Sequence, residues 1–106
     1  MTQRSDRSAM HEKMAPALNI LRILSHPVRL SILCHLVEQA EMSAGEIVAL
    51  HAPLASQSQT SQYLKRLRDE GLVNARKDGL YVYYSLARQD IRELVATLHD
   101  LYCPEA

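Results

Sequence analysis

Two helix-start signals on either side of a proline turn constrain the fold of this chain more than any other feature. Residues 43–46 and 56–59 each read as a capping box, in which a serine precedes Glu or Gln by three positions. Pro53 stops the first of these helices at about residue 50, and Gly71 is a natural end for the second. Two short capped helices joined by a tight turn predict a helix-turn-helix.

The hydrophobic period changes directly after the second capped helix. Residues 72–77 and 80–86 are short β-prone runs around Asp78-Gly79, which is the strongest short signal for a β-hairpin. A hairpin that follows a helix-turn-helix is a wing, so the sequence predicts a winged helix-turn-helix that is mainly α-helical.

Three further helices complete the predicted order α-α-α-α-β-β-α. Apolar residues recur at helical spacing from Met10 to Leu24, from Val28 to Gln39 after a cap at Ser25, and from Ile91 to the Cys103-Pro104 end. Residues 1–8 are polar and aperiodic and are predicted to be a flexible tail, with residues 9–106 forming one domain. The first and last helices carry apolar seams, which predicts a homodimer through Met14, Leu18, Leu21, Leu94, Leu98 and Leu101.

Composition excludes several classes of protein. A chain of 106 residues has the length of one domain, and it holds only two cysteines, too few for a disulfide scaffold. No apolar run is long enough to cross a membrane and no signal peptide is evident, so a cytoplasmic protein without a membrane partner is expected. No phosphate-binding loop, nucleophile elbow or buried carboxylate pair is present, which predicts neither an enzyme nor a cofactor.

The helix that begins after Ser56 carries the candidate DNA-reading side chains in its first turns. Glutamine can pair bidentately with adenine, and serine or threonine can bond bases or phosphates. Cations follow along this helix and beside the wing tip, where they can reach phosphates. The candidate DNA contacts are Gln57, Ser58, Gln59, Thr60, Ser61, Gln62, Lys65, Arg66, Arg76 and Lys77. A protein–protein module of winged-helix shape remains an alternative, which a lack of salt dependence in DNA binding would reveal.

The formal net charge is zero, with 12 Lys plus Arg and 12 Asp plus Glu, which at first argues against a nucleic-acid partner. The charges are segregated, however: residues 55–85 hold five cations and three anions, and residues 86–106 hold two cations and four anions. The predicted DNA-reading segment is therefore positive although the chain is neutral.

The two cysteines are the remaining reactive groups. Cys34 falls at the rim of the apolar face of its helix, and Cys103 ends the last helix four residues after His99. From the residues alone, each thiol can be a small hydrophobe, a redox group or, with His99, part of a thiophilic metal site.

Three segments carry a resemblance to a known family: residues 24–30 (LSHPVRL), 43–47 (SAGEI) and 56–73. This combination resembles the ArsR/SmtB winged-helix repressors over about residues 18–103. Within that family, Ile-Leu-Cys at 32–34 and Leu-Tyr-Cys at 101–103 resemble a narrower group, the reactive-sulfur sensors of the BigR and YgaV type.

The resemblance implies a homodimeric repressor that binds a palindromic operator of sulfide-handling genes. It also implies that Cys34 and Cys103 form the sensing pair for persulfides or polysulfides. Metal-sensing members carry Cys-x-Cys in the third helix, where this chain has Ser-Ala-Gly-Glu at 43–46, so no metal site is predicted. A repressor that responds to general thiol oxidation, or to a metal or metalloid, is the alternative.

Overall fold

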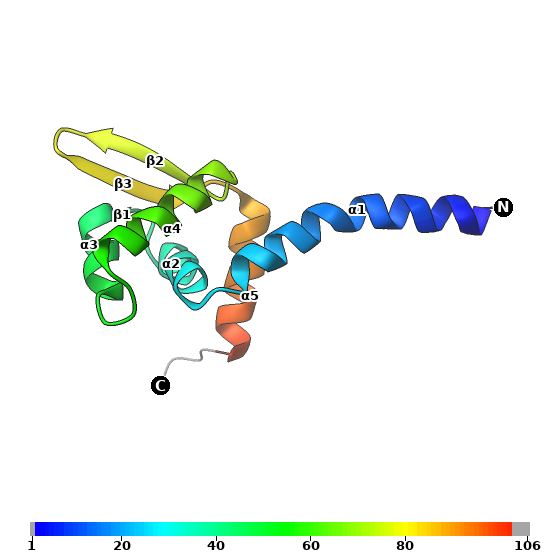
Figure 1. The fold of residues 1–106 in the computed structure, drawn as a ribbon, viewed down its shortest axis with the longest axis horizontal. Helices are drawn as coiled ribbons and strands as arrows, with labels where there is room; N and C mark the ends of the chain where they lie inside the picture. The colour runs from blue at the N-terminus through cyan, green and yellow to red at the C-terminus, as the bar shows by residue number, and fades with distance from the viewer. Residues whose placement is uncertain (1, 103–106) are drawn as a thin grey trace.

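The computed structural model describes residues 2–102, with side chains from Met10 onward. Five helices and three short strands form one body from which α1 projects (Figure 1). In chain order the elements are α1 (Thr2–Leu24), α2 (Pro27–Glu38), β1 (Met42–Ser43), α3 (Ala44–His51), α4 (Gln57–Asp69), β2 (Val73–Asp78), β3 (Tyr81–Leu86) and α5 (Gln89–Tyr102).

The predicted winged helix-turn-helix is confirmed. Both capping boxes form: Ser43 accepts from the Glu46 amide at 3.1 Å, and Ser56 accepts from the Gln59 amide at 3.0 Å. In each box the N3 side chain accepts from the cap amide in return. The start of α3 and α4 is thus fixed by their own sequence.

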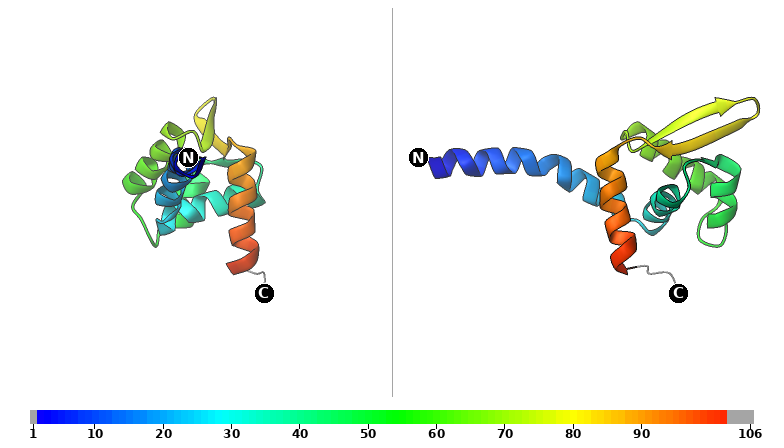
Figure 2. Two further views of the ribbon diagram at one scale, coloured as in Figure 1. Left: turned by 90° about the vertical axis from the view of Figure 1, so that its right-hand side faces the viewer. Right: turned by 180° about the vertical axis from the view of Figure 1, so that it is seen from behind.

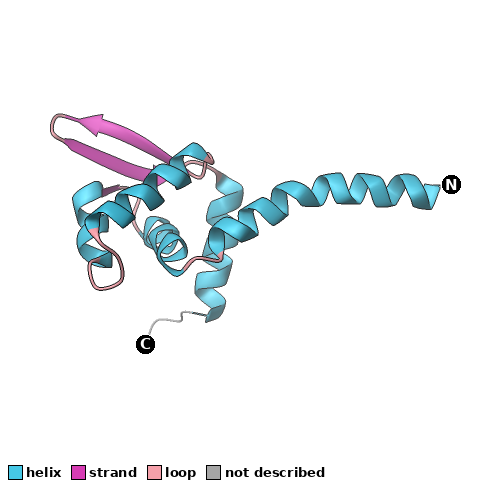
Figure 3. Ribbon diagram, in the orientation of Figure 1, coloured by secondary structure: helices cyan, strands magenta, loops and turns pink. Residues whose placement is uncertain are grey.

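The hairpin β2–β3 extends beyond α3 and α4 as the wing (Figure 3). Its turn is one residue later than the sequence predicts, because Asp78 pairs with Tyr81 and leaves Gly79 and Leu80 as the loop. Gly79 has a φ of 62° and no non-glycine residue has a positive φ among the residues described. This is the pattern of a type II′ turn, which needs glycine at its first central position.

A third strand was missed by the sequence prediction. β1 pairs antiparallel with β3, Met42 opposite Tyr84 and Ser43 opposite Tyr83, which gives the sheet order β1-β3-β2. Two residues are too short for an alternating pattern to appear in sequence. The strand ties the wing to the residue that caps α3.

Two helix starts differ from the prediction. The N-cap of α2 is His26, whose Nδ1 accepts from the Val28 amide at 3.2 Å, whereas the Ser25 hydroxyl donates back to the carbonyl of Arg22. Helix α1 begins at Thr2, so residues 2–8 are helical where a flexible tail was expected. That segment holds neither glycine nor proline, so nothing in it stops a helix already formed downstream.

The core lies where α2 is surrounded by α1, α4, α5 and β3, and α3 meets α2 through His51 and Ser31. It consists of Ile20, Ile23, Leu24, Val28, Ile32, Leu33, Leu36, Met42, Ile47, Ala55, Leu64, Leu67, Leu72, Val73, Ile91 and Val95. In the described part of the chain no single helix is long and apolar enough to span a membrane. Residues 10–24 and α2 reach that length and apolar character only when they are taken together, and they are bent by 99° relative to each other.

Candidate nucleic-acid interface

Helix α4 is amphipathic, and its packing decides which of its side chains can reach DNA. Thr60, Leu64 and Leu67 are buried and define the inner face. At about 100° per residue, the opposite face is centred on Ser58, Gln62 and Lys65. Those side chains are all exposed, so the helix turns a mixed amide, hydroxyl and ammonium surface outward.

The structure brings together most of the DNA contacts predicted on α4 but corrects one of them. Gln57, Ser58, Gln59, Ser61, Gln62, Lys65 and Arg66 are exposed. Thr60 is fully buried, so it is a core residue of the helix-turn-helix and not a base contact. Its position on the inner face follows from the helical period, since Leu64 lies four residues further on. The side chain of Gln59 is already used as the acceptor in the capping box.

Two of the three cations of α4 are paired with a carboxylate four residues further along the chain. Lys65 Nζ lies 2.9 Å from Asp69, and Arg66 Nε lies 3.1 Å from Glu70, which also accepts from Asn19 of α1. Exposed pairs at this spacing contribute about 0.3–0.5 kcal/mol, so phosphate can displace either carboxylate. Both side chains are therefore available to a DNA backbone.

The two cations of the wing differ. Arg76 of β2 donates from Nε and Nη2 to the two carboxylate oxygens of Glu41, at 2.9 and 2.8 Å. This mutual hydrogen bond lowers the pKa of Glu41 and raises the pKa of Arg76. No ion pair joins Lys77 to another of the described side chains, and it is exposed. No local pattern in the sequence points to Glu41 as the partner, because it lies 35 positions away from Arg76.

Cys34 lies half-buried on α2 and lines an open cavity of about 360 Å³. The cavity is also lined by Pro27, Leu30, Ser31, His35, Glu38 and His99. His99 comes from α5, so the cavity lies where α2 packs against α5. Cys103, the second predicted sensing residue, lies outside the described residues.

A hydrogen-bond network fixes the wall of this cavity. His51 of α3 is buried and donates from Nδ1 to the carbonyl of Ile47 at 2.7 Å, which leaves Nε2 to accept from the Ser31 hydroxyl at 2.9 Å. His35 donates from Nδ1 to the carbonyl of Ser31 at 2.8 Å and meets the ring of His51 edge-on. Within residues 2–102, no group of three or more His, Cys, Asp or Glu side chains is placed to hold a metal ion.

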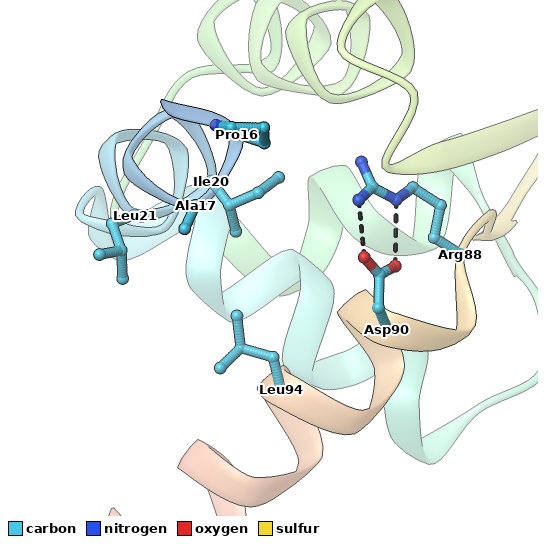
Figure 4. Close-up of a pocket in the computed structure, with 7 residues that line it drawn as sticks. All are labelled: Pro16, Ala17, Ile20, Leu21, Arg88, Asp90 and Leu94. Atoms are coloured by element: carbon cyan, nitrogen blue, oxygen red, sulfur yellow. Dashed lines mark hydrogen bonds and ion pairs between the residues drawn. The ribbon is translucent and has the colours of Figure 1, made fainter. Parts of the chain in front are cut away.

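The apolar side chains predicted for the dimer interface gather on α1 and α5. Met14, Leu18, Leu21, Leu94 and Leu101 are all more than a third exposed, whereas Leu98 packs partly against the core. Leu21 and Leu94 line an open groove of about 400 Å³ between the two helices (Figure 4). Arg88 closes one side of the groove, held by two hydrogen bonds of 3.0 and 2.6 Å to Asp90.

A capped helix with an outward polar face, a supporting helix-turn and a hairpin wing define a winged-helix DNA-binding regulator. The chain belongs to the ArsR family: residues 26–75 match the model described as "Bacterial regulatory protein, arsR family". Members of this family are DNA-binding regulators of transcription and not enzymes, as the sequence predicted.

Similar proteins match this chain over almost its whole length. The HTH-type transcriptional regulator YgaV of Escherichia coli is 38% identical over 104 residues, which are 98% of this chain and 100% of YgaV. Reduced HlyU from Vibrio cholerae has a TM-score of 0.83 at 38% identity, covering 90% of this chain and 97% of HlyU. The transcriptional repressor BigR from Xylella fastidiosa has a TM-score of 0.76 at 35% identity, and the match covers 92% of this chain and 93% of BigR. The predicted resemblance to the BigR and YgaV type is confirmed.

Proposed function

We propose that this DNA-binding regulator is a homodimeric repressor that releases a palindromic operator when reactive sulfur species link Cys34 to Cys103. The observation that carries the proposal is the cavity shared by Cys34 and His99. A sulfur donor that enters this cavity meets a thiol on α2 directly beside the last turns of α5. A chemical event there acts on the contact between the two helices.

The chemistry needs no oxidant besides the effector. The Cys34 thiolate attacks the outer sulfur of a low-molecular-weight persulfide, the S–S bond breaks, and the donor leaves as a thiolate. The Cys103 thiolate then attacks Cys34 on the inner sulfur of the new persulfide, which forms the Cys34–Cys103 disulfide and expels hydrosulfide. A longer link needs further equivalents of persulfide, and each added sulfur extends the reach by about 2 Å.

Dimerisation through α1 and α5 connects this step to DNA. The exposed leucines of both helices present an apolar face that a second copy of the chain covers in our proposal. A dimeric helix-turn-helix protein must hold its recognition helices about 34–36 Å apart to meet successive major grooves. A link that draws α5 towards α2 changes that spacing, and a coupling of about 1–3 kcal/mol is typical of such switches. The proposed function also places the protein in the cytoplasm, because it binds DNA there and because thiols stay reduced in that compartment.

The test is treatment of the reduced protein with glutathione persulfide, followed by mass spectrometry and an operator-binding assay. We expect a link between Cys34 and Cys103 and weaker binding, and Cys34→Ser should bind DNA normally without any response. Hydrogen peroxide and arsenite are the matched treatments for the oxidation and metalloid alternatives. Unchanged operator affinity after persulfide treatment would falsify the sensing proposal.

A further inference from the structure

We propose that Glu41 and Arg76 form a clamp that positions the wing for DNA, and that Arg76 is a positioning residue instead of a phosphate contact. The inference rests on the DNA-binding function of the family and not on the proposed response to sulfur. It reverses the role that the sequence predicts for Arg76.

Strand register places the clamp on one face of the sheet. Arg76 lies opposite Tyr83, and Tyr83 lies opposite Ser43, so the three side chains stand in one row across β2, β3 and β1. Glu41 precedes Ser43 by two positions and continues the same face. The other face, with Met42 and Tyr84, packs on the core. The clamp therefore crosses the outer face of all three strands.

Three nitrogens of the Arg76 guanidinium face carboxylates, although the side chain is half exposed. Nε and Nη2 donate to Glu41, and Nη1 lies 3.5 Å from the carboxylate of Asp78. Its plane lies over the ring of Tyr83, at 4.8 Å from the centroid. A bidentate pair of this kind fixes both partners in space, and it occupies the Nε–Nη2 pair of donors with which Arg76 would otherwise hold a phosphate. Lys65 and Arg66 each make a single contact to their own carboxylate, so a phosphate displaces those pairs more easily.

The position of Glu41 gives the clamp its effect. Glu41 lies just before β1, and β1 ends at Ser43, the residue that caps α3. The ion pair thus joins the middle of the wing to the start of the helix-turn-helix. Ordering the wing in its binding position before DNA arrives lowers the entropy cost of association.

The direction in which one substitution changes operator affinity distinguishes a positioning role from a simple charge effect. Removing a carboxylate near DNA should strengthen binding by reducing repulsion, and Asp69→Asn on α4 is the matched control for that effect, because Asp69 pairs with Lys65 and lies outside the clamp. Glu41→Gln removes the same charge but also breaks the bidentate pair with Arg76. We expect Glu41→Gln to weaken operator binding about fivefold, and Asp69→Asn to leave it unchanged or stronger.

The measurement is fluorescence anisotropy over a range of salt, on a duplex selected by the wild-type protein from a random library. An unrelated duplex of equal length reports non-specific binding, which Glu41→Gln should not weaken. Arg76→Gln should lower specific affinity as Glu41→Gln does, and the double variant should lose no more than either single one. Circular dichroism with thermal melting checks that the fold persists, and amide exchange of the wing should be faster in both variants.

Three results would overturn the clamp. The first is operator binding by Glu41→Gln that equals or exceeds that of the wild type. The second is a salt slope for Arg76→Gln that falls by about 0.9, the value of one lost phosphate contact. The third is a double variant whose loss equals the product of two independent losses.

Discussion

At the scale of single residues, burial distinguishes polar side chains of α4 that have similar chemistry in the sequence. Six uncharged polar residues follow one another from Gln57 to Gln62, and any of them has the chemistry to bond a base. The structure turns Thr60 into the core, where its hydroxyl has no hydrogen-bond partner. It leaves Gln62 on the outward face. A substitution at Thr60 should therefore change stability, whereas one at Gln62 should change DNA binding.

Thr60→Val should stabilise the protein without affecting DNA binding. Valine keeps the shape and removes a buried hydroxyl that forms no hydrogen bond, so the free energy of unfolding should rise by about 1 kcal/mol. Urea denaturation measures this. Gln62→Ala is the contrasting variant, and it should reduce discrimination between operator and unrelated duplexes by about 1–3 kcal/mol. A loss of operator affinity in Thr60→Val would return Thr60 to the interface.

At the scale of elements, short-range signals set where α4, the helix proposed to read DNA, begins. The Ser56 hydroxyl and the Gln59 amide close the capping box, and neither depends on distant parts of the chain. Ser58 lies two residues into the same helix and points outward. Replacing serine by alanine therefore tests the helix cap at position 56 and a proposed DNA contact at position 58.

Ser56→Ala should lower the free energy of unfolding by about 1 kcal/mol, the usual cost of a lost N-cap. Ser58→Ala, the matched control, should leave stability within about 0.5 kcal/mol. It should weaken operator binding about fivefold, as expected for one lost hydrogen bond near 1 kcal/mol. Urea melts and anisotropy titrations on both variants give the four values. Equal destabilisation by both variants would contradict the assignment of the cap.

At the scale of the whole molecule, α1 projects from the body (Figure 2). It carries exposed apolar side chains, among them Met14, Leu18 and Leu21. The groove between α1 and α5 continues this apolar face, and the wing and α4 lie away from it (Figure 1). A monomer would leave this surface in water, and a second copy would bury it. The arrangement keeps the proposed dimer contacts separate from the DNA-reading surface.

Leu21→Glu should dissociate the dimer, because it places a charge in the centre of the proposed interface. Leu21 is 55% exposed in the single chain, so the fold itself should persist. Light scattering should show half the wild-type mass, and operator affinity should fall by at least about 100-fold as bivalent binding is lost. Leu50→Glu on α3, where Leu50 is 48% exposed, is the matched control and should remain dimeric. A dimeric Leu21→Glu would place the interface elsewhere.

The sequence by itself determined the features that depend on neighbouring residues. Capping at Ser43 and Ser56, the chain reversal near Gly79 and the apolar periods of the helices are local, so the winged helix could be predicted from them. The family followed from the same segments. The candidate DNA contacts on α4 could be proposed for the same reason, since a helix N-terminus and its polar residues are adjacent in the chain.

Only the tertiary structure decided what depends on residues far apart in the chain. The pairing of β1 with β3, the burial of Thr60 and the engagement of Arg76 by Glu41 each join segments that no local pattern connects. The same holds for Cys34, whose cavity needs His99 from α5. The physical reason is that burial and ion pairing depend on which surfaces meet in space, whereas caps and turns depend on hydrogen bonds within a few residues.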